Sequence, residues 1–313
     1  MGVQDLLTRD DLDSFAVDQL AGAVTLESWL GSADRRVRQR IQNHLASGGE
    51  KEADLLVSIA RGESSETSDP LSRIHAIWGL EQWSRNHPLE DYGRLRSLAS
   101  LEGDNNAEIR RQLARVFGEM ADPRGKSVLI RLLEDPSARV RSMAAFGLAK
   151  VGAPEAREEL FQMGLEAWPN DPVLHHSAVM GLAGSCTEAD LILEGLKRDA
   201  SKERRMLALL ALRKKHHPWW LFAGVPGERE TSNGSPAEQR DPETLRNAGL
   251  RYRTKSGDIT RVHRVCRSLD LFFNDPDPEV VAEATRAIHD LYGLDSMPRL
   301  ADLLIRLTRL DSD

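Results

Sequence analysis

An aspartate followed six residues later by an arginine recurs along this chain, and such a pair could act as an acid beside an anion clamp. The stretch DPSARVRSMAAFGLAKVG, residues 135–152, contains one copy and ends at a glycine. The recurring residues are Asp104 and Arg110, Asp135 and Arg141, Asp199 and Arg205, and Asp275 in a further copy. Because a feature present in every unit of a repeat is architectural, we expect each aspartate to cap its own helix. Each arginine should bond to the neighbouring unit, which would form a ladder between repeats.

The histidines and cysteines lack the spacing of a metal site or a nucleophilic site. His175 and His176 are adjacent and therefore point in different directions on a helix. His216 and His217 precede a proline and have no acid three or four residues away. The sequence contains no His-Glu dipeptide, no CxxC and no CxxCH. We therefore expect no catalytic residue, no metal and no cofactor.

Helices must position the recurring residues, because the apolar side chains that follow them have a helical period. After Asp135, the residues Val140, Ala144 and Leu148 fall on one stripe at steps of four. A proline often follows the aspartate, and at the first turn of a helix its missing N–H costs nothing. A second apolar stripe lies in residues 154–167. Neither stripe can be buried by its own pair of helices, so neighbouring pairs must stack.

The copies recur with a period in the thirties. Aspartates at positions 69, 104, 135, 171 and 199 are separated by 35, 31, 36 and 28 residues. This period is typical of stacked two-helix units. We therefore predict an all-α fold, a right-handed α-α superhelix of about seven helix pairs. It would form a single solenoid over residues 1–313, with residues 1–26 as its N-terminal cap.

The spacing breaks once, because 76 residues separate Asp199 from Asp275. We interpret residues 216–258 as an insertion within the sixth repeat, since connections in compact domains are usually much shorter. The densest aromatic group of the chain, which contains Trp219 and Trp220, lies at its start. These side chains could fold the insertion back onto the solenoid, or they could contact a partner.

Charge is unevenly distributed over a chain whose net charge is -7, a value that argues against a surface built wholly for nucleic acid. Residues 240–267 carry eight basic and three acidic side chains, and the preceding helix adds six basic residues within 202–215. A solvated face, an acidic protein partner and a polyanion remain open as readings of this region. The candidate partner-binding residues are Trp219, Trp220, Arg251, Arg253 and Lys255.

Composition and the N-terminal sequence indicate where such a chain would work. Hydrophobic residues make up 40% of the chain but aromatic residues only 5%, which favours a core of aliphatic side chains. The first 20 residues contain acids where a signal peptide has basic residues, and no long apolar run follows. We therefore expect no membrane insertion and, for the chain as written, a cytoplasmic location.

The unit D-P-x-x-x-V-R-x-x-A-x-x-x-L resembles the HEAT repeat, in the short variety first associated with phycobilisome lyases. The segments 72–82, 107–122 and 271–304 are also similar to the HEAT segment of large multidomain bacterial proteins. Those proteins join a dehydrogenase-like β-propeller, helical repeats and a haem-binding domain. This narrower resemblance implies a scaffold segment, periplasmic if its parent is exported, and it implies no catalytic residue.

Together these observations favour a non-catalytic scaffold that binds a protein partner rather than nucleic acid. The resemblance leaves one alternative, an enzyme of the phycobilin lyase or isomerase type. The charge distribution leaves another, binding of a polyanion through residues 202–267.

Overall fold

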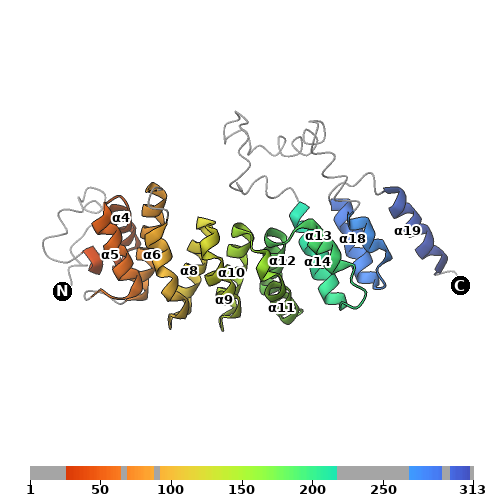
Figure 1. Cartoon of the computed structure of the whole chain (residues 1–313), viewed down its shortest axis with the longest axis horizontal. Helices are drawn as coiled ribbons and strands as arrows, with labels where there is room; N and C mark the ends of the chain where they lie inside the picture. Colours follow the sequence, from red (N-terminus) through yellow and green to blue (C-terminus); the bar gives the residue numbers. More distant parts are fainter. Residues whose placement is uncertain (1–25, 65–68, 88–91, 217–267, 291–296, 311–313) are drawn as a thin grey trace, which may run out of the picture. The chain divides into compact units, whose positions relative to one another are not determined.

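The structure is a computed structural model that describes residues 26–64, 69–87, 92–216, 268–290 and 297–310 (Figure 1). Every regular element within these ranges is a helix. The chain divides into two compact units, Met1–Glu159 and Leu160–Asp313. We call them unit 1 and unit 2.

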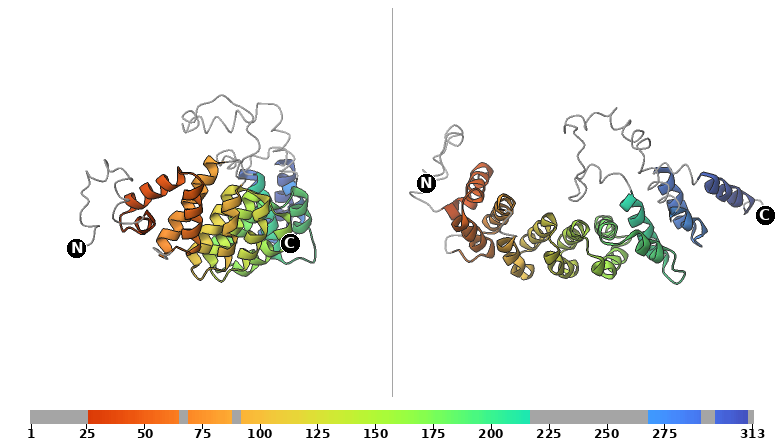
Figure 2. Two further views of the ribbon diagram at one scale, coloured as in Figure 1. Left: turned by 60° about the vertical axis from the view of Figure 1, so that its left-hand side comes forward. Right: turned by 45° about the horizontal axis from the view of Figure 1, so that its top comes forward.

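Unit 1 is built from paired helices that succeed one another along the chain (Figure 2). Its elements are α3 (Leu26–Leu30), α4 (Arg35–Ala46), α5 (Glu50–Arg61), α6 (Pro70–Asn86), α7 (Gly93–Arg96), η3 (Ser97–Gly103), α8 (Ala107–Met120), η4 (Pro123–Gly125), α9 (Lys126–Arg131), η5 (Leu132–Glu134), α10 (Ala138–Val151) and η6 (Pro154–Ala156). Helices α4, α6, α8 and α10 pack side by side in this order, and we call them the first-helix layer. Helix α5, η3 and α9 form the second-helix layer against them.

The core of unit 1 lies between these layers and follows the apolar stripes of the sequence. Val140, Ala144 and Leu148 are fully buried, as their steps of four predict. Small residues bring the two central helices close together, because a Cβ added to Gly118 would lie 2.5 Å from the Cα of Gly147. Helices α8 and α10 can therefore pack at this distance only with glycine at the crossing.

Unit 2 repeats the same arrangement with fewer described elements. These are α12 (Pro172–Ser185), α13 (Glu188–Gly195), α14 (Lys202–His216), η7 (Leu271–Asn274), α18 (Pro278–Asp290) and α19 (Met297–Leu310), while α11 (Arg157–Ala167) begins before the boundary. Helix α14 packs between α12 and α18, and it also contacts α13. Helices α14 and α18 are thus direct neighbours, although 61 residues separate them in the sequence.

The predicted all-α fold of stacked helix pairs is confirmed, and the part of the chain that the structure describes contains no strand. The candidate residues Trp219, Trp220, Arg251, Arg253 and Lys255 lie outside the described residues. The proposed N-terminal cap, apart from residue 26, and all of the proposed insertion except residue 216 lie outside them too. Among the described helices, none is long and apolar enough to cross a membrane.

The helix starts require one correction. Asp69 and Asp171 cap α6 and α12 directly, and Pro70 and Pro172 are the first helical residues, as predicted. Asp135 does not cap its helix, because Ser137 occupies the N-cap position of α10. Its carboxylate instead accepts the Ser137 N–H at 2.8 Å, an Asx turn that precedes the helix.

The same shift of two residues occurs at other copies of the repeat. Asp104 accepts the N–H of Asn106, which is the true N-cap of α8. Asp275 accepts the N–H of Asp277 at 2.9 Å. Asp199 is exposed in the turn before α14, where the N–H of Arg204 donates to Ser201 Oγ instead. The prediction that these aspartates cap their helices was therefore wrong, since an Asx turn uses the same residue type.

Candidate protein-interaction surface

Within each unit, the recurring arginines join consecutive repeats through two kinds of hydrogen bond. In unit 1, Arg110 donates to the backbone carbonyl of Asp104 at 2.6 Å and to both oxygens of Asp135 at 2.5 and 2.9 Å. In unit 2, Arg205 donates to the carbonyl of Ala200 at 2.6 Å and to both oxygens of Asp275 at 2.8 and 2.9 Å. Each arginine therefore holds its own helix start and the aspartate of the next copy.

The burial and hydrogen bonding of these arginine–aspartate pairs indicate that they stabilise the stacking of repeats. The side chains of Arg110 and Asp135 are 11% and 3% exposed. Arg73 donates to one oxygen of Asp104 and to the backbone carbonyl of Ala60. Burial raises the pKa of Asp135, but the hydrogen bonds from Arg110 and from the Ser137 N–H outweigh burial and lower this pKa below its usual value. Both carboxylate oxygens accept hydrogen bonds in this nearly buried pair, which is the arrangement of a structural ion pair between repeats.

Arg141 bonds within its own repeat. Its guanidinium donates to the backbone carbonyls of Asp135 at 2.7 Å and Pro136 at 3.3 Å. Asp135 and Arg141 therefore do not form an acid beside an anion clamp. Arg141 instead stabilises the start of α10 by bonding to backbone carbonyls.

An open groove of about 560 Å³ crosses the first-helix layer of unit 1. We call it the Trp78 groove, and its lining residues are Gln42 of α4, Trp78, Glu81, Gln82 and Arg85 of α6, and Arg111, Gln112 and Arg115 of α8. Steps of three and four residues place the side chains of α6 and α8 on one face of each helix. Stacking of α4, α6 and α8 then joins the three faces into one surface.

Hydrogen bonds fix the indole of Trp78 in the groove. Its Nε1 donates to Gln112 Oε1 at 2.8 Å. The guanidinium of Arg115 lies 5.9 Å from the centre of the indole ring, a cation–π distance, and donates to Glu81 Oε2 at 2.7 Å. Glu81 is only 9% exposed. The aromatic side chain and its arginine are therefore preorganised rather than free to rotate.

A buried histidine orients Gln42, the side chain that α4 contributes to the groove. His75 Nδ1 donates to Gln42 Oε1 at 2.8 Å, because His75 Nε2 accepts the Nε–H of Arg38 at 3.1 Å. Burial and the positive charges of Arg38 and Arg35 lower the pKa of His75 from 6.5 to about 4. His75 is thus neutral at pH 7 and orients the amide of Gln42.

The first-helix layer of unit 1 is strongly basic. Helices α4, α6, α8 and α10 contain twelve arginines and lysines but only three glutamates. This asymmetry is hidden when charge is counted along continuous segments of the sequence, where only residues 202–267 stand out. Counting charge separately for the first and second helix of each repeat would have revealed it.

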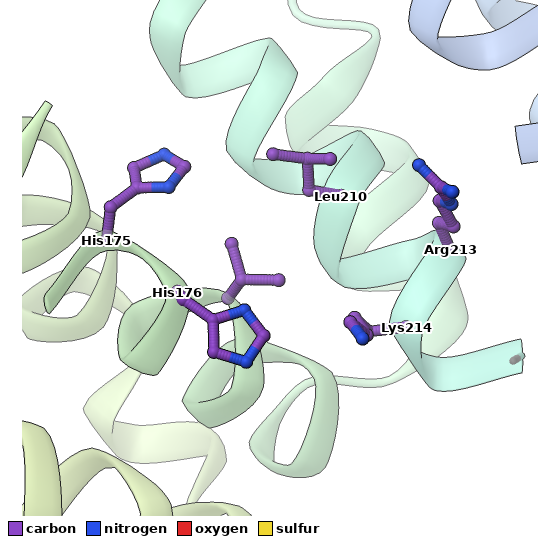
Figure 3. Close-up of a pocket in the computed structure, with 6 residues that line it drawn as sticks. His175, His176, Leu210, Arg213 and Lys214 are labelled. Atoms are coloured by element: carbon purple, nitrogen blue, oxygen red, sulfur yellow. The ribbon is translucent and has the colours of Figure 1, made fainter. Parts of the chain in front are cut away.

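A second, smaller groove of about 320 Å³ lies between α12 and α14 in unit 2 (Figure 3). We call it the His175 groove. His175, His176 and Val179 line it from α12, and Leu210, Arg213 and Lys214 line it from α14. Burial is the first cause that lowers the pKa of both His175 and His176.

The basic residues of α14 mostly bond to neighbouring elements of unit 2. Arg213 bonds to both Glu283 and Asp290 of α18. Arg204 donates to Glu194 of α13 at 2.9 Å, and Lys202 donates to Glu279 at 3.0 Å.

Lys215 also bonds within unit 2, at the end of α12. It donates to the backbone carbonyls of Ala183 and Cys186 at 3.1 and 2.8 Å, and burial lowers its pKa. Most of the basic residues of α14 therefore make contacts within unit 2. The sequence had suggested that they form part of a partner surface.

Neither groove offers a metal site. Over the described residues, no group of three or more histidine, cysteine, aspartate or glutamate side chains is placed to hold a metal ion. Cys186 is buried, 2% exposed.

Paired helices that stack through a repeated arginine–aspartate contact define a helical-repeat protein. Residues 95–183 match the family model described as HEAT repeats. This match covers less than a third of the chain and includes α8 and α10, where the repeat unit is clearest.

Comparison with solved structures finds crystal structures of engineered proteins. One is 18% identical over 90% of this chain and 81% of the other, with a TM-score of 0.38. Another is 17% identical over 85% of this chain and 95% of the other, with a TM-score of 0.31. The comparison with curated proteins found no match. The narrower resemblance to multidomain dehydrogenase-like proteins is not supported by these findings.

Proposed function

We propose that this chain is a non-catalytic helical-repeat scaffold that binds a protein partner through the Trp78 groove. The observation that carries the proposal is the partly exposed indole of Trp78, held between Gln112 and Arg115 in an open groove across three consecutive helices. Tryptophan and arginine are the residue types most enriched among side chains that dominate binding energy at protein interfaces.

The packing around the groove supports this use. A binding surface gains affinity when its side chains are already ordered, because less conformational entropy is lost on association. Trp78, Glu81 and Arg115 are connected by hydrogen bonds and a ring contact before any partner arrives. The lyase-type alternative has no comparable observation in its favour among the described residues.

The test compares two tryptophan variants in a pull-down from an extract of the source cells. The tagged full chain should retain one or more specific proteins, and Trp78→Ala should lose them. Trp168→Ala is the matched control, because Trp168 is 50% exposed and belongs to unit 2. Circular dichroism should show that both variants remain helical. Equal retention by Trp78→Ala and the unchanged chain would argue against the groove as the binding surface, as would retention of nothing.

A further inference from the structure

We infer that the partner segment in the Trp78 groove is an acidic, extended stretch of a protein that crosses the first-helix layer. This inference rests on the proposed function and names the chemistry of the partner. It follows from the charge of the layer, from the amide groups of the groove and from the spacing of the helices.

Charge complementarity is the first argument. Three loop aspartates pair with Arg36, Arg73 and Arg110, which account for three of the twelve cations of the layer. Nine cations then remain against the three glutamates of the same helices. The whole chain carries a net charge of -7, so this positive layer is a local feature. Such a surface attracts acidic segments and repels basic ones.

Unpaired amide groups are the second argument. Gln82 lines the groove from α6, and its side chain has no hydrogen-bond partner among the described residues. Gln42 uses its Oε1 to accept from His75, and no described residue accepts from its NH₂ group. A primary amide offers both a donor and an acceptor, which is the combination needed to bind a main-chain peptide group.

Helix spacing sets the pattern of the partner. Neighbouring helices pack at about 8 to 10 Å, and an extended chain rises about 3.3 Å per residue. A segment that crosses α4, α6 and α8 therefore passes one helix about every three residues. We expect acidic side chains at roughly every third position of the segment, with an apolar side chain where it meets Trp78.

A peptide fits the groove better than a nucleic acid does. Glu81 and Glu108 accept hydrogen bonds from Arg115 and Arg111, so two carboxylates lie among the arginines of the surface. A phosphate backbone carries charge at every nucleotide and would be repelled by these carboxylates. A peptide can place its acids at the arginines alone.

The probe is a fluorescein-labelled peptide with glutamate at every third position and one central phenylalanine. Its controls are the same peptide with glutamine for glutamate, and a duplex DNA of about 20 base pairs, all at about 50 mM salt. The full chain is compared with the double variant Arg85→Glu, Arg111→Glu. The matched control Lys51→Glu, Arg131→Glu makes the same change in net charge on the second helices α5 and α9.

The unchanged chain should bind the acidic peptide about tenfold more tightly than the glutamine peptide. The groove double variant should weaken this binding about tenfold or more, and the control should change it by less than about threefold. Gln82→Ala guards against misfolding of the charge variant, since Gln82 has no internal bond to lose. It should weaken binding by about threefold.

Equal weakening by both double variants, or equal affinity for the acidic and glutamine peptides, would overturn the inference. Tighter binding of the duplex with the same dependence on Arg85 and Arg111 would assign the surface to nucleic acid instead. The inference can also fail while the proposed function holds. A cellular partner that depends on Trp78 but is not displaced by excess acidic peptide would keep the scaffold and reject the acidic segment.

Discussion

The two units place positive charge on equivalent helices and use it differently. In unit 1, Arg85, Arg111 and Arg115 line an open groove and pair only with glutamates of that surface. In unit 2, Arg205 bonds to Asp275 in the turn before α18, and Arg213 bonds to Glu283 and Asp290 of α18. In unit 2 the acids in and before α18 engage the cations of α14, whereas the cations that line the Trp78 groove have glutamates of their own surface as partners.

The largest expected loss of stability comes from breaking the arginine–aspartate contact that occurs in each unit. Asp275→Ala leaves Arg205, only 7% exposed, without its carboxylate, and should lower the free energy of unfolding by about 3 to 5 kcal/mol. Asp135→Ala should have a similar effect in unit 1. Urea denaturation measures the loss, and hydrogen exchange with mass spectrometry should assign it to unit 2 or unit 1. Glu279→Ala, which removes an exposed partner of Lys202, should cost far less, because solvent screens this pair.

Acid should weaken unit 1 through His75. The unfolded chain takes up this proton near pH 6.5, whereas the folded protein resists it until about pH 4. The unfolded state therefore binds more protons between these values, and stability falls as the pH drops from 6.5 to 4, by about 3 kcal/mol. Urea denaturation across this range measures the slope.

The conservative variant His75→Gln can still donate to Gln42 and accept from Arg38 without titrating. It should flatten part of the slope, while His175 and His176 leave their own contribution in unit 2. The ladder carboxylates act in a lower range, because the pKa values of Asp104 and Asp135 are depressed and their stabilisation is lost only below about pH 4. An unchanged slope in His75→Gln would contradict the assignment.

A smaller loss of stability should distinguish Arg213, which bonds to α18, from Arg85, which lines the Trp78 groove. Arg213→Ala leaves Glu283, which is 8% exposed, with fewer partners and should cost about 1 to 3 kcal/mol of unfolding free energy. Arg85→Ala should cost less than about 1 kcal/mol, because the Arg85 side chain is 56% exposed. Thermal or urea denaturation of the two variants compares them directly. Equal losses would show that the cations of the two units are used alike.

Much of the fold was predictable because local patterns determine it. The steps from Val140 to Leu148 fix a helix, and the recurrence of the aspartates fixes stacked pairs. The helix starts were misplaced by two residues at Asp104 and Asp135, since an aspartate can either cap a helix or form the turn before it. The Trp78 groove was not foreseen, because Trp78 and Gln112 are 34 residues apart and meet only after the helices stack.

The contact between Arg205 and Asp275 also bears on the order in which the chain folds. Its two residues are 70 positions apart, whereas Arg110 and Asp135 are separated by 25. Closing the longer loop costs about 1 kcal/mol more chain entropy. Contacts of high sequence separation generally slow folding, so the layers around α8 and α10 are expected to form first and α18 to dock onto α14 afterwards. A nascent chain would expose the acidic face of α18 and the basic face of α14 during that interval.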